Sequence, residues 1–188
     1  MKLVLALLWC VVACYSYGAA VDVVPASAID EPANLIGITD MHNAVRAAVD
    51  TTGIAGGPLP PMQWSPDLAA LAAAWAIMCI DTTQNGLIDH SPFSYRTNAE
   101  GFSYIGENIY ASTGTTADAR EAFDYWASEK EFFTYPEGCT DVCGHYTQIV
   151  SRTSVALGCA LATCLNLEYK GTLICQYGPG GNFPGAPY

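Results

Sequence analysis

The sequence has few basic residues: 7 Lys and Arg stand against 18 Asp and Glu, and the formal net charge is −11. An acidic surface repels phosphate backbones and anionic headgroups, which argues against nucleic acid and anionic membranes as partners. No apolar run in the chain reaches the ~20 residues that a transmembrane helix needs, so we expect no membrane span. The chain contains no Asn-x-Ser/Thr triplet, so N-glycosylation is not expected.

The common catalytic signatures are also missing. The chain has no His-Glu-x-x-His helix of the zinc proteases, no Gly-x-Ser-x-Gly nucleophile turn and no glycine loop that would cradle a phosphate. These absences exclude the best-known hydrolase and nucleotide-binding arrangements. Any catalysis would need residues brought together only by the fold.

The N-terminus reads as a targeting segment. Lys2 is the only early charge, and the apolar run Leu3 to Ala13 is followed by small residues, Gly18-Ala19-Ala20. This order is typical of a secretory signal peptide, so we predict a signal over residues 1–20 and secretion of the mature chain. One alternative is a loose lipobox ending at Cys14, which would anchor the chain by a lipid.

Removal of the signal also removes two of the eight cysteines, Cys10 and Cys14. An even number in a secreted chain predicts three disulfides, with the pairing left open. The six that remain are Cys79, Cys139, Cys143, Cys159, Cys164 and Cys175. The alternative, a zinc site that uses Cys139-x3-Cys143 and a later pair, is disfavoured because an oxidising compartment favours disulfides.

The order of predicted elements indicates an α+β protein. Residues 21–34 are small and Pro-containing and predict a flexible leader. The second helix has a defined start, with Ser65 as N-cap and Pro66 at its first position. Helices come first and strands last, which favours local antiparallel pairing. We predict helices over 35–49, from 66 onward and over 116–132, and strands over 104–110, 155–161 and 173–177.

Four residues form a candidate metal site. The chain has three histidines, and two of them, His90 and His145, lie among polar residues in predicted loops or element ends. Glu107 lies in a strand-like run, and Glu129 lies three residues after Trp126, beside the apolar face of a helix. Imidazoles bind divalent ions directly, while carboxylates bind, hold water or orient the rings. Sequence leaves these three roles of the carboxylates open.

Four ordered motifs resemble the CAP superfamily of cysteine-rich secretory proteins, antigen 5 and pathogenesis-related protein 1. The motifs are His42-Asn43-Ala44-Val45-Arg46, Gly106-Glu107-Asn108-Ile109, Gly144-His145-Tyr146-Thr147-Gln148-Ile149-Val150, and Leu173-Ile174-Cys175-Gln176-Tyr177-Gly178-Pro179-Gly180-Gly181-Asn182-Phe183. The pattern is most similar to pathogenesis-related protein 1-like members. The resemblance implies a CAP domain over 35–188, folded as a three-layer α/β/α sandwich around a small antiparallel sheet.

The same resemblance assigns residues to roles. It implies that His90, Glu107, Glu129 and His145 form the cavity tetrad of the family, in which the two histidines hold a divalent ion such as zinc. It also implies the disulfides Cys79–Cys164, Cys139–Cys143 and Cys159–Cys175. His42, Asn43 and Arg46 are instead expected to be structural, with Arg46 in a local polar network.

Two features depart from the family or leave its function open. Ser151 stands where the family usually has Trp, which we expect to change packing beside the cavity. The aromatic residues Phe132, Phe133 and Tyr135 occupy the region of a sterol-binding loop in some members, and a core or rim role fits them equally well. We expect a secreted monomer that acts as a binding or effector module toward an extracellular protein. The alternatives are a sterol or lipid carrier, and a metal-dependent hydrolase with Glu107 or Glu129 as base.

Overall fold

The computed structural model describes residues 31–188. The predicted signal peptide, 1–20, and residues 21–30 of the predicted leader lie outside the described residues. Glu31, also assigned to the leader, is buried, and its carboxylate accepts hydrogen bonds from Gly37 N at 2.6 Å and Thr39 N at 2.9 Å. These two bonds hold the chain against the start of the first helix, so the folded part begins earlier than the boundary predicted at residue 35.

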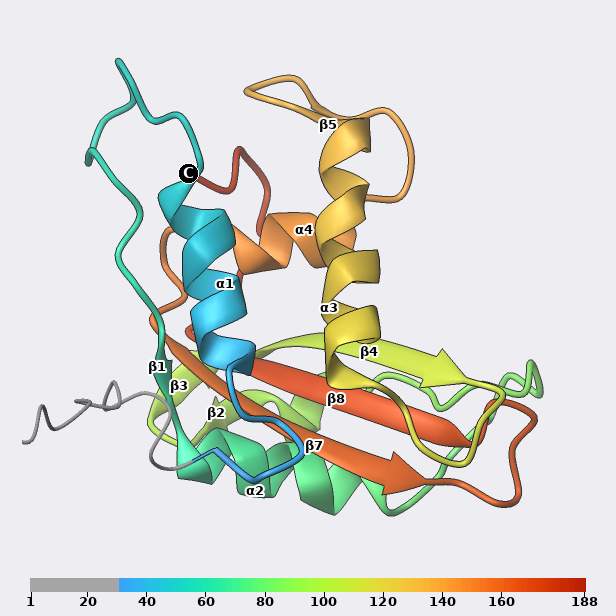
Figure 1. Cartoon of the computed structure of the whole chain (residues 1–188). Coiled ribbons are helices and arrows are strands. Elements are labelled where there is room, and N and C mark those ends of the chain that lie inside the picture. The colour runs from blue at the N-terminus through green and yellow to red at the C-terminus, as the bar shows by residue number, and fades with distance from the viewer. Residues whose placement is uncertain (1–30) are drawn as a thin grey trace, which may run out of the picture.

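A four-stranded sheet forms the middle layer, in the order β1-β7-β8-β4 (Figure 1). Strands β4, β8 and β7 pair antiparallel, and the short β1 adds to β7 in parallel. Helix α2 covers one face, while α1, α3 and α4 lie over the other (Figure 1). The predicted α+β class and three-layer arrangement are confirmed. The strands are β1 (Gln63–Trp64), β4 (Gly106–Ser112), β7 (Ala156–Thr163) and β8 (Gly171–Gly178).

Two small hairpins and two 3-10 segments complete the strands and 3-10 helices of the described residues. The hairpins pair β2 (Thr97–Ala99) with β3 (Phe102–Tyr104), and β5 (Phe133–Thr134) with β6 (Gly138–Cys139). The 3-10 turns are η2 (Phe93–Tyr95) and η3 (Glu129–Phe132). The second turn continues α3 and ends at the aromatic segment.

Local sequence sets the first three helices, α1 (Ile38–Ala47), α2 (Pro66–Ala76) and α3 (Ala119–Ser128). Ser65 Oγ accepts Leu68 N at 3.2 Å, so the predicted N-cap of α2 is confirmed. Asp118 caps α3 in the same way by accepting Arg120 N and Glu121 N. Each cap satisfies amide groups that the first helical turn leaves unpaired.

The helix α4 (Gly144–Ile149) was not predicted. Its N-cap residue, Cys143, makes no side-chain cap bond. The carboxylate of Glu129 instead accepts His145 N at 2.8 Å and Tyr146 N at 3.2 Å. The cap of α4 therefore comes from the end of α3, and no local pattern could reveal it.

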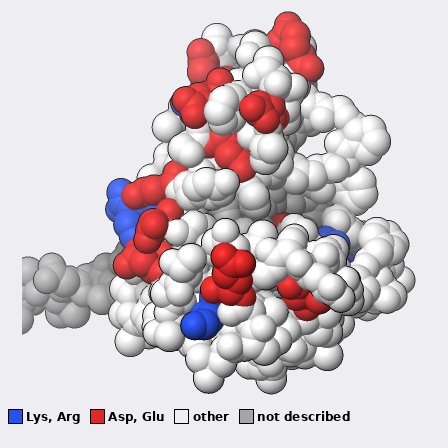
Figure 2. Space-filling model, turned by 90° about the vertical axis from the view of Figure 1, so that its right-hand side faces the viewer, with Lys and Arg blue, Asp and Glu red and all other residues white. Residues whose placement is uncertain are grey.

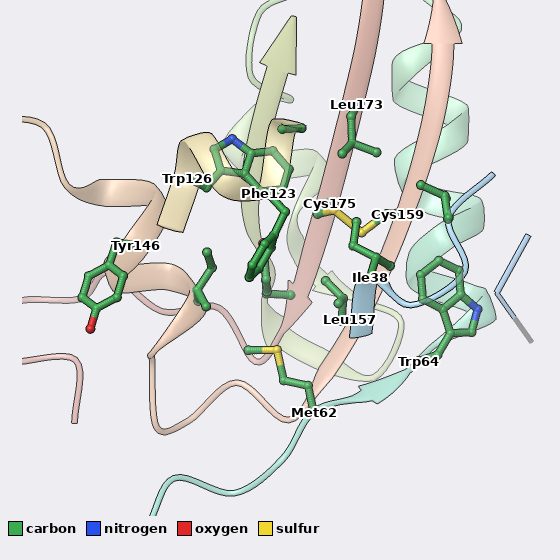
Figure 3. Packing of buried hydrophobic residues seen from close by; sticks show 14 of the residues in the cluster. Ile38, Met62, Trp64, Phe123, Trp126, Tyr146, Leu157, Cys159, Leu173 and Cys175 are labelled. Atoms are coloured by element: carbon green, nitrogen blue, oxygen red, sulfur yellow. A yellow bond between two sulfur atoms is a disulfide. The ribbon is translucent and has the colours of Figure 1, made fainter. Parts of the chain in front are cut away.

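The main core lies between the sheet and the helices α1, α3 and α4 (Figure 3). Its largest members are fully or nearly fully buried: Ile38, Met62, Trp64, Phe123, Trp126, Tyr146, Leu157 and Leu173. A second cluster lies under α2 around Trp75 and Ile174. A Cβ at Gly158 would overlap the backbone of Leu68 and Ala69, so this glycine lets the alanine-rich α2 approach β7 closely.

Three disulfides stabilise this arrangement, and each pairing implied by the family resemblance is confirmed. Cys79–Cys164 links the end of α2 to the β7–β8 connection across 85 residues. Cys159–Cys175 bridges the facing strands β7 and β8 within the core (Figure 3). Cys139–Cys143 closes a short loop just before α4. Among residues 31–188, none of the helices has the length and hydropathy to cross a bilayer.

Candidate functional site

A cleft of about 580 Å³ opens beside β4 and brings the two candidate metal-binding histidines together. His90 reaches it from the loop before η2, and His145 reaches it from the first turn of α4. Figure 2 shows this side of the molecule, which is hollowed between its upper and lower parts. The other lining residues are Thr83, Asn85, Leu87, Ile88, Asp89, Ile109, Tyr110, Ala111 and Tyr125.

The first histidine is held by a buried carboxylate. His90 Nδ1 lies 2.8 Å from Glu107 Oε1, and Ser91 N donates to the same oxygen at 2.9 Å. The other oxygen, Oε2, accepts Ser91 Oγ at 2.7 Å and Gln176 Nε2 at 3.2 Å. Burial opposes ionisation of Glu107, but the hydrogen bonds from His90 and Ser91 outweigh it and lower the pKa of this carboxyl. An ionised carboxylate only accepts, so Nδ1 of His90 carries the proton.

The second histidine repeats this arrangement. His145 Nδ1 lies 2.6 Å from Glu129 Oε1, while Oε2 of the same carboxylate accepts His145 N and Tyr146 N. The His145 ring also stacks on Trp126, with centroids 6.0 Å apart and an interplanar angle of 17°. The carboxylate and the indole together fix the plane of this imidazole.

Both rings therefore present the same atom to the cleft. Within residues 31–188 no hydrogen bond engages Nε2 of His90 or of His145, and a ring protonated at Nδ1 carries its lone pair on Nε2. A carboxylate that orients a ligating imidazole through its other nitrogen is a common partner of metal sites. The donor set thus fits a divalent ion held by two imidazoles. No group of three or more His, Cys, Asp or Glu in the described part of the chain could hold a metal ion.

A chain of buried hydrogen bonds holds the backbone of His145. Asn108 Nδ2 donates to the backbone oxygen of His145 and to the hydroxyl of Tyr177, both at 3.1 Å. That hydroxyl lies 2.9 Å from His42 Nε2, and His42 Nδ1 lies 2.8 Å from the oxygen of Ile38. Burial lowers the pKa of His42 to about 4, so this ring is neutral and structural, as predicted.

The comparisons with known proteins identify the family. The sequence profile of the CAP family, described as the cysteine-rich secretory protein family, matches residues 39–177. The chain belongs to the CAP family. It is 37% identical over 159 residues to human GLIPR1-like protein 1, across 80% of this chain and 64% of that protein. It is 33% identical to mouse Glioma pathogenesis-related protein 1, across 79% of this chain and 53% of that protein. The CAP chain thus spans less than two thirds of these relatives.

Solved structures share the fold. NaASP2, solved with Zn²⁺, aligns with a TM-score of 0.61 and 26% identity over 87% of this CAP chain and 88% of that chain. Schistosoma mansoni venom allergen-like protein 4 aligns with a TM-score of 0.63 and 24% identity, covering 81% and 91% of the two chains. The second likeness shows the fold alone.

The aromatic segment of the CAP domain lies away from the histidine cleft. Phe133 packs against the rings of Tyr146 and Tyr188, at 5.8 and 6.0 Å, and Tyr135 stacks on Tyr188 at 5.0 Å. Phe132 ends η3 and is half-buried. Phe133 lines a separate groove of about 410 Å³ between the β5–β6 hairpin and the C-terminal tail.

Ser151 also lines this second groove rather than the histidine cleft. Its side chain points to Thr153 Oγ1 at 3.0 Å, and a Cβ at Gly181 would lie 2.6 Å from it. The expectation that this position affects packing at the histidine cavity is therefore wrong, because the residue faces the tail.

Sequence reasoning missed the residues that hold the carboxylate of Glu107 and the ring of His145. Ser91 and Gln176 supply three of the four donors to Glu107. Trp126 supplies the surface under His145. The adjacency of Ser91 to His90 and the place of Gln176 in a family motif were available signals, but their use as donors depends on contacts between distant segments.

Proposed function

We propose that this chain is a secreted CAP-domain binding module whose cleft holds one divalent metal ion, with zinc as the leading candidate. Nε2 of His90 and Nε2 of His145 are the protein ligands, and Glu107 and Glu129 orient the rings. The observation that carries this proposal is the repeated pairing of a cleft-lining imidazole with a buried carboxylate through Nδ1. The Zn²⁺ in the NaASP2 structure adds support.

The arrangement favours binding over hydrolysis. All four oxygens of Glu107 and Glu129 already accept hydrogen bonds from protein donors. A general base needs an oxygen in reach of a water molecule, so neither carboxylate is well placed for the base role. A bound zinc ion would supply an electrophilic centre with open coordination positions for a partner group.

The proposed setting is extracellular. Three disulfides are typical of chains that fold in an oxidising compartment. The sequence of residues 1–20 supports a cleaved signal peptide, and we propose a monomer that meets an extracellular partner. A lipid anchor through Cys14 is the alternative, and intact mass measurement of the secreted protein separates the two.

Zinc titration by calorimetry tests the metal proposal. Wild-type protein should bind one equivalent, and the double variant His90→Ala/His145→Ala should bind none at the same concentration. Asp124→Asn is the matched control, because it removes a negative charge from an exposed pair with Arg120 and leaves both imidazoles intact. Equal binding by wild type and the double variant would make the four residues a structural polar network.

A sterol or lipid is a second candidate ligand, favoured by the groove between hairpin and tail. Its lining includes the apolar side chains of Phe133, Pro136, Phe183 and Pro184. A sterol pull-down should retain wild-type protein and lose Phe183→Ala, an exposed residue whose loss does not open the core. Absence of retention by the wild type removes this candidate.

A further inference from the structure

The outer edge of β4 along the histidine cleft has no strand paired with it. The sheet order ends at β4, and within residues 31–188 no strand pairs with its outer side. Residues 106–108 of this strand are buried, whereas 109–112 are partly exposed. Ile109, Tyr110 and Ala111 line the same cleft as His90 and His145. A sheet edge and the two imidazoles therefore share one hollow.

Strand geometry identifies which backbone groups face the cleft. Cys159 and Cys175 face each other across β7 and β8 with a Cα–Cα distance of 4.1 Å, typical of a pair without mutual hydrogen bonds. The N–H and C=O groups of Cys175 therefore point to β4, where Asn108 lies opposite. Alternation then turns the backbone groups of Ile109 and Ala111 away from β8. The bond from Trp126 Nε1 to Ile109 O, at 3.2 Å, agrees with this direction.

The exposed part of this edge has little of the usual protection against pairing: Trp126 Nε1 occupies Ile109 O, which leaves the outward backbone groups of Ala111 and the N–H of Ile109 for a partner. Natural edge strands are blunted by Lys, Pro, bulges or covering segments. The residues from Ile109 to Ser112 read Ile-Tyr-Ala-Ser, with neither charge nor proline. Such an edge accepts an extended peptide as an added strand through main-chain hydrogen bonds.

The surroundings of the edge favour a basic occupant. Asp89 lines the cleft, and Glu121 contacts the side chain of Tyr110. The exposed ring of Tyr125 lies between Tyr110 and His145, with centroids at 6.0 and 6.4 Å. Aromatic faces and carboxylates together attract Lys and Arg side chains. Acidic side chains also cover more of this side of the molecule than basic ones (Figure 2).

We propose that the cleft binds an extended, Lys- or Arg-rich segment of a partner protein, which adds to the sheet as a strand beside residues 109–112 of β4. This names the partner chemistry of the proposed binding module. The proposed strand addition rests on the proposed function only because both use the same cleft. Pairing with the backbone of β4 does not require the metal.

Fluorescence anisotropy with a labelled peptide of alternating Lys and Val tests the proposal. Ala111→Pro removes an N–H that points away from β8, so it takes no donor from the β4–β8 ladder. It should weaken binding about ten-fold or more, the equivalent of one lost hydrogen bond. Ala111→Val keeps the N–H at the same position and should bind as wild type does. A Glu-Val peptide, and a Lys-Val peptide N-methylated on alternate residues, should also bind more weakly.

The outcomes separate this inference from the metal proposal. Peptide binding that persists in EDTA and in His90→Ala/His145→Ala, but falls in Ala111→Pro, supports strand addition whether or not zinc binds. Equal binding by Ala111→Pro and Ala111→Val, or no binding of the Lys-Val peptide, overturns it. Preference for the Glu-Val peptide would indicate an acidic partner at this edge of the sheet. Dimerisation that Ala111→Pro abolishes would indicate a second copy of the chain there, and either result would also overturn the proposal.

Discussion

Glu129 Oε1 lies 2.6 Å from His145 Nδ1, and the second oxygen of the same carboxylate accepts the backbone N–H of His145 at 2.8 Å. One side chain at the end of α3 therefore caps α4 and orients the imidazole that α4 carries. The position of a candidate ligand and the start of the helix that presents it depend on the same buried charge.

Replacement of Glu129 should weaken both the cap of α4 and the orientation of the His145 ring. In Glu129→Gln, the side-chain NH₂ group replaces one carboxylate oxygen that now accepts hydrogen bonds from His145 or Tyr146. A donor would then face a donor, which is unfavourable. We expect zinc affinity to fall about 10- to 100-fold, as for other partners that orient metal ligands. The free energy of unfolding should fall by about 1–3 kcal/mol. Calorimetry and urea unfolding measure the two effects. Glu131→Gln, an exposed change in the same turn, should alter neither, and equal effects from both variants would contradict the double role.

The buried His42 should make stability depend on pH. Its pKa is lowered from 6.5 to about 4, so between these values the unfolded state binds the extra proton and stability falls as pH decreases. The shift corresponds to about 3 kcal/mol, present above pH 6.5 and lost by about pH 4. Urea unfolding across this range should show a flatter pH dependence for His42→Gln than for wild type. An unchanged slope in His42→Gln would show that other groups cause the pH dependence.

The three disulfides should differ in their contribution to stability. In the chain-entropy account, the 85-residue separation of Cys79 and Cys164 corresponds to about 4–5 kcal/mol, and the 4-residue separation of Cys139 and Cys143 to about 2 kcal/mol. Paired alanine variants compared by urea unfolding measure both. A larger loss from the Cys139/Cys143 pair than from the Cys79/Cys164 pair would show that the short loop stabilises chiefly through the folded state.

Gly106 should not tolerate a side chain. A Cβ there would overlap Oε1 of Gln148, which accepts Gly181 N at 2.9 Å and so ties the tail to α4. Gly106→Ala should destabilise the fold by about 1–3 kcal/mol, the usual effect of overpacking. Gly144→Ala is the control, because a Cβ at Gly144 meets nothing within 4 Å. Similar unfolding midpoints for the two variants would contradict this packing role.

The sequence predicted features whose causes are local or that come with family motifs. The start of α2 follows from Ser65 and Pro66 alone, and the strands β7 and β8 follow from short-range alternation. The disulfide pairing came from the resemblance, because spacing leaves it open. Asn43 and Arg46 are structural, as expected, and bond to backbone groups of Met62, Pro60 and Ile149.

What could not be predicted depends on contacts between distant segments. The start of α4 needs Glu129, and the ionised state of Glu107 needs donors from Ser91 and Gln176 on other elements. The same contacts support an orienting role for the carboxylates in the proposed metal site, where the sequence left binding, holding water and orienting the rings open. Ser151 was assigned to the wrong cavity because its direction depends on where the C-terminal tail lies.

The most direct test of the account follows the individual nitrogen atoms of the three histidines by NMR during zinc addition to ¹⁵N-labelled protein. Nε2 of His90 and of His145 should shift together and saturate at one equivalent, while each Nδ1 keeps its proton. His42 is an internal control, because both of its ring nitrogens already have hydrogen-bond partners, and its signals should stay in place. Unchanged Nε2 signals in His90 and His145 at excess zinc would contradict the central claim that these two imidazoles form a metal site.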